Sequence, residues 1–431
     1  MALLPLDHPD RLVLADEVHA RPPEPLETPA RTSYLALLVE PDERERERQH
    51  IAGLCAGFDV APPDASATQF SAQLGAVRMK WERHGEFSGY TFFTPGLSAE
   101  PYSEPVASLL PTSWLAALPG KTIVAAHAKL AATSGAPPDA AFLAKHFGAH
   151  IAVGGLIGES AGYAFTDFRI HADGCSRFLL IDNGLTPRQA GRMMQRLFEI
   201  EAYRMLALLA LPIARRQSPR IVAIEKSLAT LTDGIAAGGD KIGHEEALLH
   251  ELTRLAAEVE SGLAASQFRF GACRAYNELV RTRISELRET RLPGTQTIEE
   301  FMDRRFTPAV NTCATVSQRL HDLSERVAQA SGLLATRVGI AREKQNQALL
   351  ASMDRRAKLQ LRLQQTVEGL SVAAIVYYAA GLVGYLVKAA KAGGLNIEPD
   401  LAVGIAVPLL AIVAVVAVRR ARRRATLAEP V

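Results

Sequence analysis

The sequence predicts an α+β cytosolic domain, then a long α-helical stalk, then a C-terminal two-helix transmembrane hairpin. Three observations lead to this prediction. Residues 1–215 alternate short β-like runs with helical patterns, residues 216–366 are rich in Ala, Leu, Glu, Arg and Gln, and residues 367–431 hold most of the extreme hydrophobicity. A chain of 431 residues is too long for one ordinary domain, so we place domain boundaries at these changes in composition.

The overall charge and the cysteines argue against several classes of protein. The formal net charge is +2, so the chain lacks the basic field of a dedicated nucleic-acid binder, and we expect no nucleic-acid partner. The four cysteines lie far apart without CxxC or Cys/His spacing, which argues against a zinc module or a disulfide framework and fits a reducing cytosol. The N-terminus has no basic region followed by a long apolar core, so no signal peptide is expected.

In the N-terminal domain, short apolar or alternating runs are interleaved with helical patterns. Strands are expected at 33–40, 70–81, 87–94, 122–130, 149–157, 161–170 and 177–182. Helices are expected at 41–55, 103–117 and 187–211. This interleaving predicts an α+β domain with a mixed or antiparallel sheet. No glycine-rich phosphate-binding motif follows a strand, so nothing favours a nucleotide site.

The stalk is predicted from long stretches of helix-favouring residues with two breaks, at 234–243 and 291–295. Thr297 opens a T-x-x-E pattern typical of a capping box. One apolar stripe then recurs at three- and four-residue steps: Leu320, Leu323, Val327, Ala330, Leu334, Val338, Ala341, Leu349 and Met353. A helix of roughly 80 residues, on the order of 120 Å long, is unstable alone and needs a partner. We expect homo-oligomerisation through this stalk; the alternative is an intramolecular hairpin with residues 248–291.

Two uncharged runs of 18 residues, at 370–387 and 401–418, predict the transmembrane hairpin. Each is long enough to cross a hydrocarbon core of roughly 30 Å, so the lipid bilayer is an expected partner. Clustered positive charge stays on the cytoplasmic side of a membrane, which puts both chain ends there. The basic cluster that follows the second run is also expected to lie on anionic lipid headgroups. It consists of Arg419, Arg420, Arg422, Arg423 and Arg424.

Three polar pairs at strand spacing are the most chemically suggestive feature of the N-terminal domain. They are Glu17 with His19, His84 with Glu86, and His171 with Asp173. Residues two apart on a strand share a face, so each pair would present an imidazole and a carboxylate together. Convergence of the pairs would supply ligands for a divalent metal or an acid/base couple. The alternative is a set of solvated strand-edge and turn residues.

Arginines near these pairs leave two further interpretations open. Arg21, Arg169 and Arg177 could bind an anion bidentately. Asp167 with Arg169, and Arg196 with Glu199, could equally form ion pairs that hold the last helix of the domain on the sheet. No Ser/His/Asp or Cys/His arrangement is defined by spacing, so the catalytic residues, the metal and the cofactors remain unassigned.

Several longer phrases resemble a known family. They are Glu17-Val-His-Ala-Arg-Pro, Lys80-Trp-Glu-Arg-His-Gly-Glu-Phe, Thr166-Asp-Phe-Arg-Ile-His-Ala-Asp-Gly, Leu185-Thr-Pro-Arg-Gln-Ala-Gly-Arg and Leu359-Gln-Leu-Arg-Leu-Gln-Gln-Thr-Val-Glu-Gly-Leu-Ser. Together they resemble a bacterial family of uncharacterised membrane-anchored proteins, a domain of unknown function. The resemblance covers essentially the whole chain. It implies a membrane anchor and no established activity, substrate or cofactor.

A looser resemblance is to the CorA-type divalent-cation channels. It concerns the order along the chain of a cytosolic domain, a long helix that continues into a first span, and a second span. Those channels carry Gly-Met-Asn just after their first span, where this chain has Gly394, Leu395 and Asn396. Lys388 and Lys391 at the same mouth would repel cations, which counts against conduction.

The favoured hypothesis is a homo-oligomeric protein of the bacterial inner membrane. Its cytosolic domain would bind a ligand or partner, and the stalk and hairpin would tether it. The alternatives are a CorA-like ion channel or transporter, and a metal-dependent enzyme built on His19, His84 and His171. The absence of a catalytic signature favours a role without catalysis.

Overall fold

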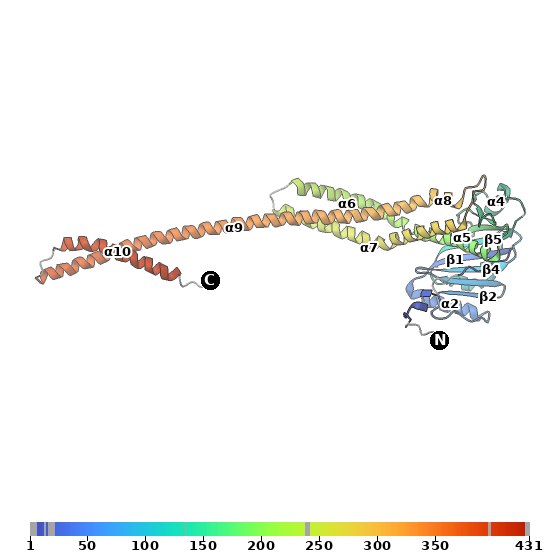
Figure 1. Cartoon of the computed structure of the whole chain (residues 1–431), viewed down its shortest axis with the longest axis horizontal. Helices are drawn as coiled ribbons and strands as arrows, with labels where there is room; N and C mark the ends of the chain where they lie inside the picture. The colour runs from blue at the N-terminus through green and yellow to red at the C-terminus, as the bar shows by residue number, and fades with distance from the viewer. Residues whose placement is uncertain are drawn as a thin grey trace. The chain divides into compact units, whose positions relative to one another are not determined.

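The computed structural model describes residues 7–12, 14–15, 22–133, 135–237, 242–394 and 398–426 (Figure 1). The chain divides into two compact units, Met1–Ser331 and Gly332–Val431. The first unit holds an α/β sheet domain and a helical bundle. The second holds the end of a long helix and a C-terminal apolar helix. The division into three parts at residues 215 and 366 stays a prediction.

One mixed sheet of eight strands organises the N-terminal domain, in the order β2-β3-β4-β1-β5-β8-β7-β6. The strands are β1 (Ala30–Leu38), β2 (Gln69–Leu74), β3 (Val77–Arg83), β4 (Phe87–Pro95), β5 (Lys121–Ala132), β6 (Val153–Ile157), β7 (Gly162–Thr166) and β8 (Ser176–Asp182). β5 and β8 are parallel, and every other neighbouring pair is antiparallel. Of the two predicted alternatives, a mixed or an antiparallel sheet, the sheet is the mixed one.

Helices cover both faces of this sheet. On one face, α2 (Arg44–Ala56, after the short helix η1, Pro41–Glu43) and α3 (Thr112–Ala116) bury Trp81 and Phe92, and α4 (Ala140–Phe147) buries Phe165 and Leu179. On the other face lies α5 (Pro187–Leu208), where the Phe198 ring stacks on Tyr34 at 4.8 Å between ring centroids. Neighbouring strand residues point to opposite faces, so buried residues of the central strands contribute to the packing on both faces.

Two local predictions need correction, and one helix was missed. The expected strand 70–81 is a hairpin, because Gly75 adopts a φ of +60° and turns the chain between β2 and β3. The expected helix 103–117 is reduced to η2 (Val106–Leu109) and α3, because Pro105 and Pro111 come directly before them and restrict the chain. Helix α4 was not predicted at all.

The helical part of the first unit is an intramolecular bundle of α6 (Leu211–Ala237), α7 (Ile242–Leu287) and the beginning of α9 (Thr307–Ala392) (Figure 1). The three helices meet at Gly262 of α7, where a Cβ would lie in ordinary contact with Leu320 of α9, at 3.5 Å, and Gln217 of α6, at 3.6 Å. Between α7 and α9, helix α8 (Ile298–Arg305) begins at Thr297 with the predicted capping box, in which Glu300 completes the reciprocal hydrogen bonds.

The apolar stripe of α9 changes environment along its length. Leu320, Leu323 and Val327 are buried, whereas Leu349 and Met353 are 61% and 59% exposed. In the second unit, α10 (Pro399–Thr426) folds back along the end of α9 (Figure 1). Among the described residues, two helical segments are long and apolar enough to cross a membrane. Their most apolar windows have mean hydropathies of 1.9 and 2.9 and are 6% and 0% buried.

Candidate metal centre

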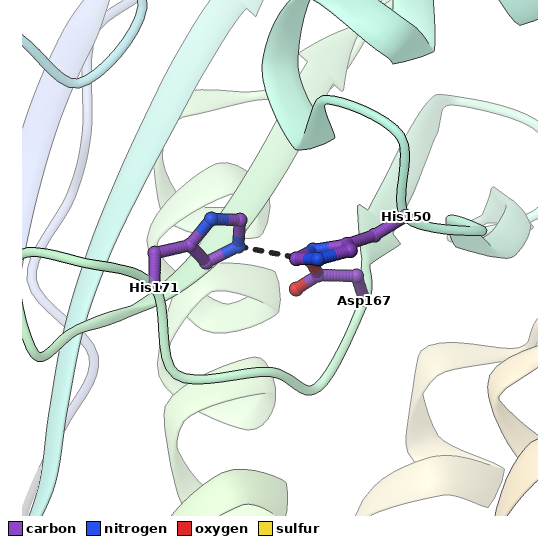
Figure 2. Close-up of side chains that lie close together, drawn as sticks. All are labelled: His150, Asp167 and His171. Carbon is purple, nitrogen blue, oxygen red and sulfur yellow. Dashed lines mark hydrogen bonds and ion pairs between the residues drawn. The ribbon is translucent and has the colours of Figure 1, made fainter.

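Three side chains converge beside the end of β7 (Figure 2). His150 lies in the loop after α4, Asp167 directly follows β7, and His171 lies in the loop between β7 and β8. The apolar cluster of Phe147, Phe165 and Leu179 packs α4 against β7 and β8, so these loops meet at one edge of the cluster. The site is thus built by tertiary packing of three segments.

Asp167 is the centre of the group. Its Oδ2 lies 2.9 Å from Nδ1 of His150 and 2.9 Å from Nε2 of His171. The two imidazole rings are 5.2 Å apart between centroids. One ligand atom from each residue lies within 4.8 Å of the others. In this arrangement both facing nitrogens carry protons and donate them to one carboxylate oxygen.

Contacts of the Phe168 side chain hold the turn that follows Asp167. Phe168 has a φ of +52°, an unusual conformation for a large residue, which returns the chain so that His171 reaches Asp167. The Phe168 ring is fixed by stacking on Phe301 of α8, with 5.1 Å between centroids, and by the Arg204 guanidinium 5.4 Å away. The structure therefore stabilises an otherwise strained turn at the site.

The second carboxylate oxygen is also engaged. Asp167 Oδ1 accepts a hydrogen bond from the backbone N–H of Arg169 at 3.2 Å. The side chain of Asp167 is fully buried, that of His171 is 8% exposed and that of His150 is 37% exposed. Within the described part of the chain, the ion-pair partners of Asp167 are the two imidazoles. A buried carboxylate needs such compensation.

This donor set can serve two kinds of chemistry. Two imidazole nitrogens and a carboxylate oxygen are ligands for zinc, iron, cobalt and related divalent ions. The same groups could pass a proton between the solvent-facing His150 and the interior. Nearby, Arg177 lies 5.1 Å over the ring of Tyr102. Burial raises the pKa of the Tyr102 hydroxyl; the Arg177 charge opposes this rise and the Asp167 charge adds to it.

The predicted residues in this region are only partly brought together. Asp167 and His171 meet directly, while Arg169 contributes its backbone N–H. Asp173 instead accepts a hydrogen bond from the N–H of Cys175 at 3.0 Å and lies 3.8 Å from Arg177. His171 and Asp173 are in a turn before β8, so the assumption that this pair shares a strand was wrong.

The other predicted pairs do not join this group. His84 and Glu86 form the turn between β3 and β4, and β1, β5 and β8 separate β4 from β7 in the sheet. Glu86 forms an ion pair with Arg269 of α7. Glu17, His19 and Arg21 lie outside the described residues.

Sequence reasoning missed His150. It lies 17 residues before Asp167 in a loop and carries no motif. Its position depends on α4, whose N-cap signal is Asp139, a side chain that accepts the N–H of Phe142. Recognising that cap would have placed His150 just after a helix, without showing that it faces Asp167.

The candidate residues of the hairpin are less completely described. Gly394 has a φ of +102° at the end of α9, and Leu395 and Asn396 lie outside the described residues. Arg419 and Arg420 are exposed on α10. The side chains of Arg422, Arg423 and Arg424 are outside the described part.

Comparison with known proteins identifies a family and no function. No curated protein and no solved structure matches the chain, so the resemblance to CorA-type channels has no support from them. A model of one family, described as a protein of unknown function (DUF3422), matches residues 6–425. Because this match spans nearly the whole chain, the protein belongs to the DUF3422 family.

Proposed function

We propose that this protein is anchored in the bacterial inner membrane by the hairpin of α9 and α10, with its N-terminal domain in the cytosol. The observation that carries the proposal is the exposure of two strongly apolar segments. Their windows, with mean hydropathies of 1.9 and 2.9, are 6% and 0% buried. Exposed apolar surface of this extent is unfavourable in water and favourable in the hydrocarbon core of a bilayer.

Contact between the two helices supports a hairpin. A Cβ built on Gly384 of α9 would lie 3.3 Å from a methyl group of Val403 of α10. Ala380, one turn earlier, is buried although most of the surrounding helix is exposed. Small residues let helices approach closely inside a membrane, where the packing of helices on each other stabilises the pair.

The distribution of charge supports the orientation. Four basic residues lie shortly before the first apolar segment, and a basic cluster follows the second apolar segment. The first group consists of Arg355, Arg356, Lys358 and Arg362. Between the segments, Lys388 and Lys391 are balanced by Glu398 and Asp400. Loops rich in Lys and Arg remain cytoplasmic, so both outer ends are placed in the cytosol.

In this proposal the N-terminal domain binds a ligand or partner beside the membrane, without a catalytic role. The exposed apolar residues of α9 before the first span, such as Leu349 and Met353, support self-association through this part of the helix. The native mass of the full-length protein in mild detergent tests this part. A native mass equal to that of a monomer would contradict self-association and would leave the proposal of a membrane anchor unchanged.

Deletion of residues 367–431 tests the anchor. The truncated chain is expected in the soluble fraction, whereas the full-length chain stays in the membrane fraction after washing with high salt and with carbonate. A matched control is the double substitution of Leu349 and Met353 by Ser, which removes exposed apolar groups outside the spans and is expected to leave the protein membrane-bound. A truncated chain that remained in washed membranes would contradict the proposal.

Orientation is tested with a membrane-impermeant thiol reagent on intact spheroplasts. A Gly394→Cys variant is expected to react, because residue 394 lies in the exported link. A Leu349→Cys variant is expected to react only after the membrane is permeabilised. The reverse pattern would show that the chain has the opposite orientation.

A further inference from the structure

We propose that His150, Asp167 and His171 bind one divalent transition-metal ion. This inference concerns the N-terminal domain and does not depend on the membrane anchor. It starts from the convergence of two imidazole nitrogens on a single carboxylate oxygen, each at 2.9 Å. The three residues come from separate loops, and each directs its ligand atom toward the others (Figure 2).

The spacing of these atoms suits a shared ion. Ligand atoms about 2.0–2.2 Å from a metal lie roughly 3–3.5 Å from one another when they are neighbours in its coordination sphere. The two nitrogen–oxygen distances of 2.9 Å are already close to this range. The three atoms lie within 4.8 Å, so the imidazoles need a small approach. His150, the most exposed of the three side chains, has the freedom to make it.

Electrostatics also favours a cation at this position. The fully buried Asp167 carboxylate has the two imidazoles as its ion-pair partners in the described chain. Each neutral imidazole can carry its proton on the ring nitrogen that faces away from Oδ2, which leaves the facing nitrogen free to bind a metal ion. The metal ion then lies between these nitrogens and Oδ2 and supplies two positive charges without requiring protonated imidazoles. The Arg169 N–H on Oδ1 then acts as an outer contact that orients the ligating carboxylate.

The ligand types define the class of ion. Calcium and magnesium prefer sites made of oxygen atoms, whereas imidazole suits zinc, iron, cobalt and nickel. Three protein ligands leave at least one coordination position for water, and the 37% exposure of His150 places this position toward solvent. We therefore infer an open His₂Asp site of the zinc class, in contrast to a closed structural site with four protein ligands.

Metal titration of the full-length protein tests this inference. The protein is purified in detergent without a histidine tag, stripped with a chelator, and titrated with Co²⁺, whose visible spectrum reports its ligands. One Co²⁺ is expected to bind per chain and to be displaced by Zn²⁺. His150→Ala, Asp167→Asn and His171→Ala are each expected to weaken binding by at least about 100-fold, since each removes a direct ligand.

A matched control is His321→Ala. His321 is an exposed histidine on α9 whose Nδ1 contacts the carbonyl oxygen of Ser317, and its loss is expected to leave Co²⁺ affinity unchanged. His150→Ala is the decisive site variant, because its partly exposed side chain can be removed without opening the core. Thermal unfolding verifies that this variant is folded. The proposal is overturned if the wild type binds no stoichiometric Co²⁺ or Zn²⁺, or if folded His150→Ala binds as tightly as His321→Ala.

Discussion

Glu289, in the loop between α7 and α8, provides a quantitative prediction about pH. Its carboxylate oxygens lie 2.9 and 3.0 Å from the backbone N of Ile298 at the start of α8. Burial raises the pKa of Glu289 to about 7; the hydrogen bonds from Ile298 and Glu299 oppose this rise, and the charges of Glu299 and Glu300 add to it. The loop therefore contains a carboxyl group that ionises near neutral pH.

The sign of the effect follows from the raised pKa. A carboxyl group with a pKa of 4.5 in the unfolded chain and about 7 in the folded chain binds its proton more tightly when folded. Its stabilising contribution is complete below pH 4.5 and is lost as the pH rises through 7. The difference between the two values corresponds to at most about 3 kcal/mol, at about 1.4 kcal/mol per pH unit.

The perturbation is Glu289→Gln, which keeps an oxygen acceptor for α8 but cannot ionise. Between pH 5 and pH 8, the unfolding free energy of the variant minus that of the wild type is expected to rise by up to about 3 kcal/mol. Urea unfolding followed by tryptophan fluorescence measures it, because Trp81 and Trp114 are the two tryptophans of the chain and both are buried in the domain core.

Glu325→Gln is the matched control, because Glu325 is exposed on α9 and its neutralisation should give no such rise. A difference between Glu289→Gln and wild type that is the same at pH 5 and pH 8 would refute the reasoning. The result also bears on the candidate metal centre. Phe301 of α8 stacks on Phe168 beside Asp167, so loosening of α8 would release one support of the site.

Three further substitutions test the packing by the same urea assay. Glu47→Ala is expected to destabilise by about 3 kcal/mol, because the fully buried carboxylate accepts hydrogen bonds from Trp81 and from a tyrosine, and these donors would lose their partner. Gly191→Ala is expected to cost about 1–3 kcal/mol, because its Cβ would lie 1.7 Å from the carbonyl oxygen of Glu24. Thr297→Ala is expected to cost about 1 kcal/mol through loss of the N-cap of α8.

Each substitution has a control of the same chemical type. Glu45→Ala changes an exposed carboxylate on α2, Gly53→Ala adds a methyl group where no atom lies within 4 Å, and Thr312→Ala removes an exposed hydroxyl inside α9. None of these controls should destabilise by more than about 0.5 kcal/mol. Gly53→Ala should instead stabilise by about 0.5–1 kcal/mol, because Gly53 lies inside α2 and alanine favours the helix. A control as destabilising as its partner would show that the named contact does not carry the effect.

Local features of this protein were determined by the sequence itself. The break at 291–295 and the helix cap at Thr297 follow from short-range backbone preferences, which neighbouring residues decide. The two apolar runs near the C-terminus are equally evident, because their hydrophobicity requires no knowledge of partners. The interleaved pattern of strands and helices indicated a sheet domain that was either mixed or antiparallel, and the parallel pair of β5 and β8 makes it mixed.

Tertiary structure alone decided the strand order, the parallel pairing of β5 with β8 and the convergence of His150, Asp167 and His171. Apolar alternation shows that a strand has a buried face, but many neighbours can cover that face equally well. His150 and Asp167 are brought within 2.9 Å by the packing of α4 on β7 and β8, whereas His84, with similar local polarity, is held several strands away. Convergence of side chains depends on these long-range contacts, and no local pattern encodes them.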